Sequence, residues 1–384
     1  MSKYIKYQIK QWLPILAVIF SIFFVTLIVD IYLSSNLFGP SYNDNDYIQY
    51  KNPLFSTMIA GLLLTFFIPI FSFSYKYSIK KADTYMQLPF NTNRLRITSY
   101  LFGYLAIILP FIIMSLIGVS IISITQACKN PYVVNQYIFG VGDLPHIIEY
   151  YYNYGYLFLT LFVTILLIFF EYSLSCIAAY HANNTLDSFL YIIFFFIFRL
   201  LILYAIPAYF LFHMDIYVNY NVIGWNTNVF SEIFLISLIL NQLIAYGSYK
   251  GNLFTNSYNN DTNLQNIGLI VSVILVAILG ILAFIYLIFT KDKYKENYGR
   301  KRNNTLFDFL LPHLTLLLIC FSIYGSNMDI TSSVCVIIAF FIVYYCILAG
   351  LNKSFKIKKL DLIYGGCVGL ISFSLFVAHC SLIA

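Results

Sequence analysis

The chain has 384 residues, of which 60% are hydrophobic and only 10% are charged, whereas about 25% of the residues of an ordinary soluble domain carry a charge. A soluble domain of this length has too little interior to keep so much apolar surface away from water. The composition therefore excludes a soluble enzyme, a nucleic-acid-binding domain and a disordered chain. It predicts an all-α, polytopic integral membrane bundle embedded in a lipid bilayer.

Nine apolar stretches reach the length of about 20 residues that a helix needs to cross a membrane core about 30 Å thick. They are continuously apolar rather than alternating, which favours helices over the strands of a membrane barrel. The nine predicted transmembrane helices are residues 12–34, 54–76, 97–124, 156–180, 188–212, 266–290, 306–325, 331–350 and 361–383.

The distribution of positive charge indicates whether a tenth apolar run, residues 233–249, crosses the membrane. With nine spans and a cytoplasmic N-terminus, the five inner segments hold 17 of the 22 lysines and arginines; these segments are residues 1–11, 77–96, 181–187, 291–305 and 351–360. This bias is what the positive-inside rule requires. A full crossing by 233–249 would move six basic residues of 291–305 to the outer side. We therefore predict a re-entrant or interfacial outer helix at 233–249, in a multi-pass protein of the cell (plasma) membrane.

The sequence lacks the common motifs of nucleotide, metal and hydrolase chemistry. It contains no Gly-Lys dipeptide, no H-E-x-x-H and no G-x-S-x-G, and its five histidines share no metal-ligand spacing. A phosphate-binding loop, a zinc-hydrolase helix and a serine-hydrolase elbow need those arrangements. We expect no catalytic residue, metal site or cofactor in this chain, which is therefore not predicted to be an enzyme.

Two charged residues lie deep in consecutive predicted spans, Glu171 in the fourth and Arg199 in the fifth. At 1.5 Å per residue they lie at comparable depth, about 20 and 23 Å from the centre of the connecting turn 181–187. Each charge alone costs about 2.5–3.5 kcal/mol at the centre of a membrane helix. One hypothesis is an ion pair across the hairpin; a role in a transport path is the alternative.

The segment between the second and third spans, residues 76–100, is longer than a simple tether requires. It predicts a short basic helix, a break at Leu88-Pro89 and a new helix capped by Thr92 or Asn93. Its charges alone suit an ordinary inner loop. Its length also permits an amphipathic element along the inner membrane surface, against which a soluble partner can press.

Two motifs in inner segments carry a family resemblance. Residues 81–90 (KADTYMQLPF), followed by Asn93-Arg94-Leu95, resemble the cytosolic loop of type 2 ABC exporter permeases, in which an acidic residue precedes Leu-Pro and a basic residue begins the third helix. The run of Lys295, Glu296 and Gly299 (KENYG) is similar to a basic-Glu-x-x-Gly motif after the sixth helix in one multi-span bacterial branch. The chain departs from the usual six spans by three more, in 306–384.

The resemblance implies a permease subunit that pairs with a separate ABC ATP-binding subunit and with a second permease or another copy of itself. Residues 79–93 would form the coupling element in the groove of the ATPase. The coupling residues implied by the motif are Asp83, Tyr85, Leu88, Pro89 and Arg94. The implied organisation is a permease core at 1–290, a basic cytosolic linker at 291–305 and three additional spans at 306–384. The expected substrate of the exporter is amphipathic: a peptide, an antibiotic or a lipid-like molecule.

Three other classes of function remain open. An ion- or proton-coupled transporter would use the buried Glu171. A membrane-embedded transferase would need a cluster of catalytic groups near one interface, for which Asp187 with His181, or Asp308 with His313, are the candidates. A non-transporting scaffold or immunity protein would share only the topology of a permease.

Overall fold

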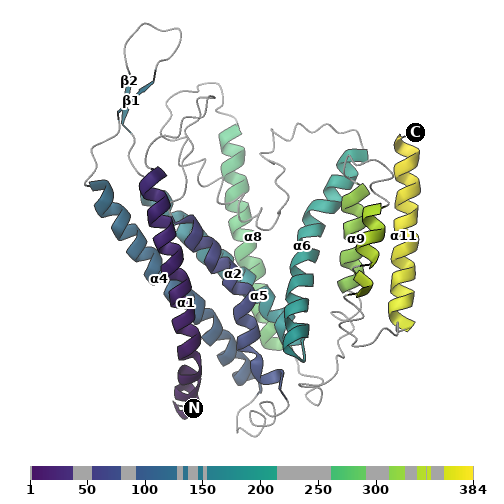
Figure 1. The fold of residues 1–384 in the computed structure, drawn as a ribbon, viewed down its shortest axis with the longest axis horizontal. Coiled ribbons are helices and arrows are strands. Elements are labelled where there is room, and N and C mark those ends of the chain that lie inside the picture. The colour runs from purple at the N-terminus through teal and green to yellow at the C-terminus, as the bar shows by residue number, and fades with distance from the viewer. Residues whose placement is uncertain are drawn as a thin grey trace. The chain divides into compact units, whose positions relative to one another are not determined.

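A computed structural model describes the chain over a series of mainly helical segments (Figure 1). The described residues are 2–37, 54–78, 92–127, 133–136, 146–149, 154–213, 261–290, 311–324, 335–342, 344–346 and 359–383. The structure divides into two compact units, each of which is described separately. Unit 1 is Met1–Ser72, Asn93–Leu174 and Ile236–Phe289; unit 2 is Phe73–Thr92, Ser175–Leu235 and Thr290–Ala384.

The described elements are helices apart from one short hairpin. The helices are α1 (Ser2–Leu37), α2 (Phe55–Ser72), the 3₁₀ turn η1 (Ser74–Lys76), α4 (Thr92–Ala127), α5 (Tyr154–His181), α6 (Thr185–His213), α8 (Asp261–Phe289), α9 (Leu311–Tyr324) and α11 (Lys359–Ile383). Residues 335–342 and 344–346 are also helical. Each of the nine predicted spans therefore overlaps a helical segment, which confirms the helical interpretation of the apolar runs.

Four helices within the described residues are long and apolar enough to cross a membrane. They are Ile9–Tyr32, Phe55–Lys76, Asn93–Ile121 and Phe158–His181. Together with the composition, they make this chain a multi-pass membrane protein. Further apolar helices of 10–17 described residues are Val276–Phe289, Leu311–Cys320, Cys335–Cys346 and Ile363–Leu375.

The short hairpin was not predicted. Strand β1 (Val133–Gln136) pairs antiparallel with β2 (His146–Glu149), with Val133 opposite Glu149 and Gln136 opposite His146. Two four-residue strands give only a weak alternating signal between long apolar runs, and the nine residues between Gln136 and His146 exceed the two to five residues of a usual hairpin loop. The hairpin connects α4 to α5.

The first helix shows how unit 1 is packed. Trp12, Ile19, Phe23 and Leu27 are buried at spacings that place them on one face of α1, and Phe23 meets Phe111 of α4 with ring centroids 5.9 Å apart. The opposite face is also apolar but exposed, with Val18, Phe24, Val25, Ile28 and Val29. An exposed face of this kind is unfavourable in water and is favourable against lipid chains, in agreement with a membrane-embedded helix.

In unit 2, α9 packs against α6 and against α11. The buried imidazole of His313 in α9 lies between two tyrosine rings, with centroid distances of 5.3 Å to Tyr344 and 5.6 Å to Tyr364. These aromatic contacts hold α9 to the two helical segments that follow it in the sequence. The described helices of the region predicted as three additional spans therefore pack against one another within unit 2.

Candidate functional site

The structure describes the residues on both sides of the predicted coupling element. Residues 79–91, with the coupling candidates Asp83, Tyr85, Leu88 and Pro89, lie outside the described residues. The preceding flank is the end of α2 with η1 and Tyr77, and the following flank is the first turns of α4. The contacts of these two flanks show what the segment is attached to.

The first flank is attached to the end of α5 by a buried lysine. Lys76 is only 3% exposed. Its Nζ donates a hydrogen bond to the carbonyl oxygen of Tyr180 and lies 3.8 Å from the centroid of the Tyr180 ring. Tyr180 belongs to the last turn of α5, where carbonyl groups have no N–H partner within the helix. Lys76 thus caps the C-terminus of α5, where the helix dipole favours a cation.

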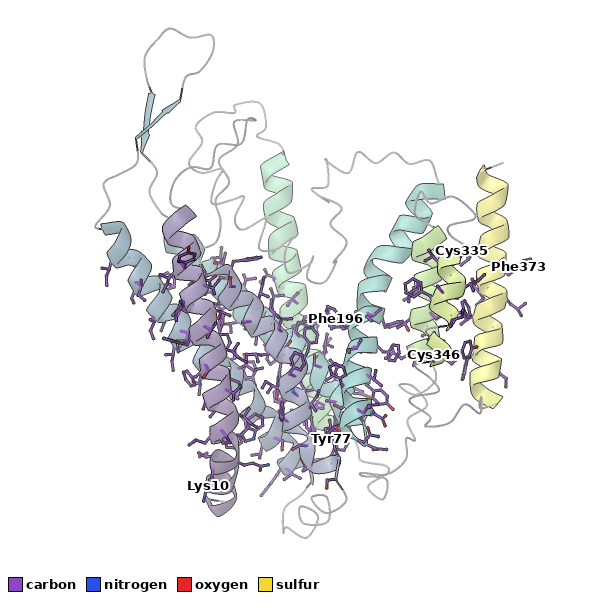
Figure 2. The ribbon with its side chains drawn as sticks, in the orientation of Figure 1. Lys10, Tyr77, Phe196, Cys335, Cys346 and Phe373 are labelled. Carbon is purple, nitrogen blue, oxygen red and sulfur yellow. The ribbon has the colours of Figure 1, made fainter. Side chains whose placement is uncertain are left out.

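Tyr77 extends this attachment to the start of α6 (Figure 2). Its hydroxyl hydrogen-bonds the carbonyl oxygen of Ala179 at 2.9 Å and Oγ of Ser188 at 2.8 Å. Burial raises the pKa of the Tyr77 hydroxyl far above its ordinary value, although the hydrogen bond with Ser188 acts in the opposite direction. Tyr77 therefore remains a neutral hydrogen-bonding group at physiological pH and joins the preceding flank to both helices of the α5–α6 hairpin.

The turn between α5 and α6 is closed by a local cap. Asn184 Oδ1 accepts a hydrogen bond from the backbone N–H of Asp187 at 2.8 Å, and Asn184 Nδ2 donates to Asp187 Oδ2 at 2.7 Å. This arrangement satisfies the first turn of α6 and puts a carboxylate near the positive end of the helix dipole. Asp187, a candidate of the transferase hypothesis, thus has a clear structural role, and its partner His181 contacts the Tyr180 ring at a centroid distance of 6.2 Å.

The second flank is attached to the end of α8 by a buried arginine. Arg96 is 1% exposed. Its Nη2 donates to the carbonyl oxygen of Ile288, one residue before α8 ends, and to Asn93 Oδ1 at 3.0 Å. As with Lys76, a cation meets the negative end of a helix and satisfies a carbonyl that lacks an intrahelical partner.

Two basic residues in the first turns of α4 have different environments. Arg94 is exposed, whereas Arg96 is buried. Two positions along an α-helix rotate the side chain by about 200°, so the two residues cannot share a face. Arg94, the coupling candidate, is accessible to a partner, while its role stays a prediction. The sequence analysis did not single out Arg96, although its spacing of two from Arg94 signals that one of the pair points inward.

The two predicted intramembrane charges lie in different units. Glu171 of α5 is 2% exposed, in unit 1. Arg199 of α6, in unit 2, donates from Nε to the carbonyl oxygen of Phe195 at 3.4 Å, and its guanidinium carbon lies 5.2 Å and 5.8 Å from the ring centroids of Phe195 and Phe196 (Figure 2). The predicted ion pair stays a prediction.

A group of hydroxyls joins α2, α4 and α5 inside unit 1. The hydroxyl cluster comprises Ser72, Tyr100, Tyr172 and Ser173, all of them buried or nearly so. The Tyr172 hydroxyl lies 3.1 Å from Ser72 Oγ and donates to the carbonyl oxygen of Tyr100 at 3.0 Å, and the Tyr100 hydroxyl lies 2.8 Å from Ser173 Oγ. A Cβ atom at Gly103 would collide with Ser72 Oγ and the Tyr172 hydroxyl. The cluster thus depends on glycine at this position of α4.

A buried carboxylate that the sequence analysis missed caps the start of α2. Asp30 of α1 is 4% exposed. Its Oδ1 accepts from the backbone N–H of Ser56 at 2.8 Å, and its Oδ2 accepts from the N–H and the hydroxyl of Thr57 at 2.8 Å and 2.7 Å. These N–H groups belong to the first turn of α2 and have no partner within the helix. Asp30 lies at the end of an apolar run, and this placement is the one sequence signal of its role.

Several further predictions fall outside the described residues. They concern the outer segment 233–249, the basic linker 291–305 with Lys295, Glu296 and Gly299, and Asp308. Within the described part of the chain, no group of three His, Cys, Asp or Glu side chains is arranged to hold a metal ion.

The described site is therefore a set of polar attachments at helix ends around the predicted coupling element, together with a hydroxyl cluster inside unit 1. Comparison with known protein families, with curated proteins and with solved structures found no match for this chain.

Proposed function

We propose that this chain is the transmembrane permease subunit of an ATP-driven ABC exporter, in which a separate subunit hydrolyses ATP. The observation that carries the proposal is the attachment of both flanks of residues 79–91 to helix ends, through Lys76 and Arg96. A coupling element must have fixed ends, because a push from the ATPase is otherwise lost in motion of the loop itself.

The burial of Lys76 and Arg96 favours a role of these residues in transmitting force over a role in setting the membrane topology alone. The positive-inside rule needs basic residues only near the inner membrane surface, where they remain hydrated. Lys76 and Arg96 are instead almost fully buried. Burying a cation is costly unless hydrogen bonds offset the loss of water. The bonds of Lys76 to Tyr180 and of Arg96 to Ile288 offset this cost and fix both flanks of residues 79–91.

The contact between Arg96 and Ile288 also supports the proposed topology. It brings the start of α4 and the end of α8 to the same end of unit 1. Two points of a chain on the same side of a membrane are separated by an even number of crossings. If α4, α5, α6 and α8 each cross the membrane, as the sequence predicts, they provide four crossings, and a full crossing by 233–249 would make five. This parity agrees with the predicted re-entrant or interfacial helix at 233–249 rather than with a full crossing by that segment.

In the proposed assembly, residues 79–93 occupy a groove of the ATP-binding subunit, with Asp83, Tyr85, Leu88, Pro89 and Arg94 at the contact. Two permease subunits, either identical or homologous, form the path for an amphipathic substrate. Arg94 is exposed and therefore accessible to the ATP-binding subunit, whereas Arg96 is buried within the permease.

A second candidate function rests on Glu171. This carboxylate is buried beside Tyr172 of the hydroxyl cluster, and a buried intramembrane acid is a common element of proton- or ion-coupled transporters. The two functions differ in their energy source, so a measurement of ATPase activity separates them.

The test is purification of the tagged chain in mild detergent, followed by an ATPase assay of the eluate. We expect an ATP-binding subunit to co-purify and its ATPase activity to be stimulated. Substitution of Asp83 or Arg94 by alanine should abolish the stimulation. Lys10→Ala is the matched control for Arg94→Ala, because Lys10 is an exposed basic residue near the cytoplasmic N-terminus (Figure 2). An inactive single chain, or unchanged stimulation in both variants, would contradict the proposal and favour the coupled transporter.

A further inference from the structure

The two flanks of residues 79–91 use the same physical device. On one side Lys76 donates to the carbonyl of Tyr180 at the end of α5; on the other side Arg96 donates to the carbonyl of Ile288 at the end of α8. In each case a buried cation caps the C-terminus of a helix that is distant in sequence. Neither contact is local, since the partners are 104 and 192 residues apart.

Each attachment has a second contact that fixes its direction. The ammonium of Lys76 also lies over the ring of Tyr180, and a cation in this position is attracted to the face of the ring. The guanidinium of Arg96 also donates to Asn93 Oδ1, on the preceding turn of its own helix. The side chains are therefore held in one geometry, as transmission of a displacement requires.

The first attachment reaches further than one helix. Tyr77 follows Lys76 directly and bonds both Ala179 of α5 and Ser188 of α6, and the α5–α6 turn is itself closed by Asn184 and Asp187. A displacement of the chain at Lys76 and Tyr77 therefore acts within unit 2, on the last turn of α5 and the first turn of α6. A displacement at Arg96 acts on α8, within unit 1.

We propose that Lys76 and Arg96 are the positioning residues through which a displacement of residues 79–91 reaches the transport helices: Lys76, with Tyr77, acts on the end of α5 and the start of α6, and Arg96 acts on the end of α8. The proposal rests on the proposed permease function and assigns the transmission step to two residues outside the family motif. Docking of the ATPase belongs to exposed groups such as Arg94, and transmission belongs to these buried caps.

The experiment uses the full-length chain with the ATP-binding subunit that co-purifies with the wild-type protein, reconstituted in lipid nanodiscs. The variants are Lys76→Met and Arg96→Met, which keep the length of the side chain and remove its charge and donors. Lys76→Arg and Arg96→Lys are the conservative variants, and Lys10→Met is the exposed control. The concentration of ATP-binding subunit at half-maximal stimulation and the maximal stimulated ATPase rate are measured for each.

We expect the methionine variants to bind the ATP-binding subunit as tightly as wild type while the maximal stimulation falls about tenfold, the shift that corresponds to loss of one hydrogen bond to a charged group. The conservative variants should recover part of the stimulation, and Lys10→Met should behave as wild type. A purely structural defect would lower the amount of folded protein and would leave the rate of the folded fraction unchanged.

Three results would overturn the inference. Unchanged maximal stimulation in both methionine variants would show that the caps transmit nothing. Weaker binding with a normal maximal rate would assign both residues to docking instead. If the methionine variants do not fold, Asn93→Ala and Tyr77→Phe retain both cations; the first removes the hydrogen bond of Arg96 to Asn93 and the second removes those of Tyr77 to Ala179 and Ser188. Full stimulation in both would exclude the transmission role. Absence of any ATP-binding subunit from wild-type preparations would be a different result, because it would refute the proposed function itself.

Discussion

The hydroxyl cluster inside unit 1 and the capped helix ends of the two units are held together by different chemistry. In the cluster, Ser72, Tyr100 and Tyr172 connect three helices through neutral hydroxyl and carbonyl groups. At the helix ends, the contacts use full charges. Asp30 meets the start of α2, Arg96 meets the end of α8 and, in unit 2, Lys76 meets the end of α5.

The difference follows from where the helix backbone can compensate a charge. Within a helix every N–H is already paired and each C=O has only its second lone pair to offer, so the backbone compensates a buried charge poorly, and neutral hydroxyls are the less costly link. At a helix end the last backbone groups are unpaired and the dipole has a definite sign. All three charges have the sign that this predicts: the anion lies at an N-terminus and the two cations lie at C-termini.

The largest expected effect comes from removing the anion. Asp30→Ala leaves two N–H groups and a buried hydroxyl at the start of α2 without their acceptor. We expect the free energy of unfolding to fall by about 3–5 kcal/mol, measured by thermal or denaturant unfolding in detergent. Asp30→Asn keeps one acceptor oxygen and should lose clearly less. Equal stability of Asp30→Ala and wild type would contradict the cap.

A smaller loss is expected inside the hydroxyl cluster. In Gly103→Ala the new methyl group occupies the space of Ser72 Oγ and the Tyr172 hydroxyl, so both must move and their hydrogen bond is lost. We expect a loss of about 2–4 kcal/mol in the same unfolding assay. Gly366→Ala in α11 is the matched control, because its Cβ has open space around it among the described residues. A similar small effect at both positions would show that Gly103 is not under this constraint.

The predicted pair of Glu171 and Arg199 tests whether charge compensation also operates away from helix ends. Glu171→Gln should destabilise the protein by about 1–2 kcal/mol if the carboxylate has a charged partner. The double variant with Arg199→Gln should then lose less than the sum of the single variants. Full stability and expression of Glu171→Gln would remove the ion-pair hypothesis.

The smallest effect is confined to alkaline solution. Burial raises the pKa of Tyr77 above the ordinary tyrosine value of about 10, so the folded state holds this proton more tightly than the unfolded state. The contribution is fully present below about pH 10 and is lost as the pH rises above it. Tyr77→Phe should therefore flatten the loss of stability above pH 10 while costing about 1 kcal/mol at neutral pH. Identical pH profiles for wild type and Tyr77→Phe would show that Tyr77 does not contribute.

The helices were predictable because membrane crossing imposes a local condition on the sequence. A run of about 20 apolar residues is visible without knowledge of its neighbours, and every predicted span overlaps a helix. The polar contacts were not predictable in this way. Tyr100 and Tyr172 are 72 residues apart and Asp30 and Thr57 are 27 apart, and no motif marks such pairs.

The limit of what the sequence can predict is clearest for the basic residues. Counting charges along the chain predicted which segments face inward, but the count treats Arg94 and Arg96 as equivalent and leaves Lys76 at the edge of the second predicted span. The tertiary structure separates them, because two of the three are buried against carbonyl groups and one is exposed.

The amino-acid sequence by itself determined that this protein is a helical membrane protein, where its helices lie and which segments carry the basic charge, since hydrophobicity and net charge are sums over neighbouring residues. Only the tertiary structure decided which charges are buried, which helix end each one caps and where glycine is required. Those properties depend on the distance between atoms that are far apart in the sequence, and burial changes the energy of a charge by more than any local preference does.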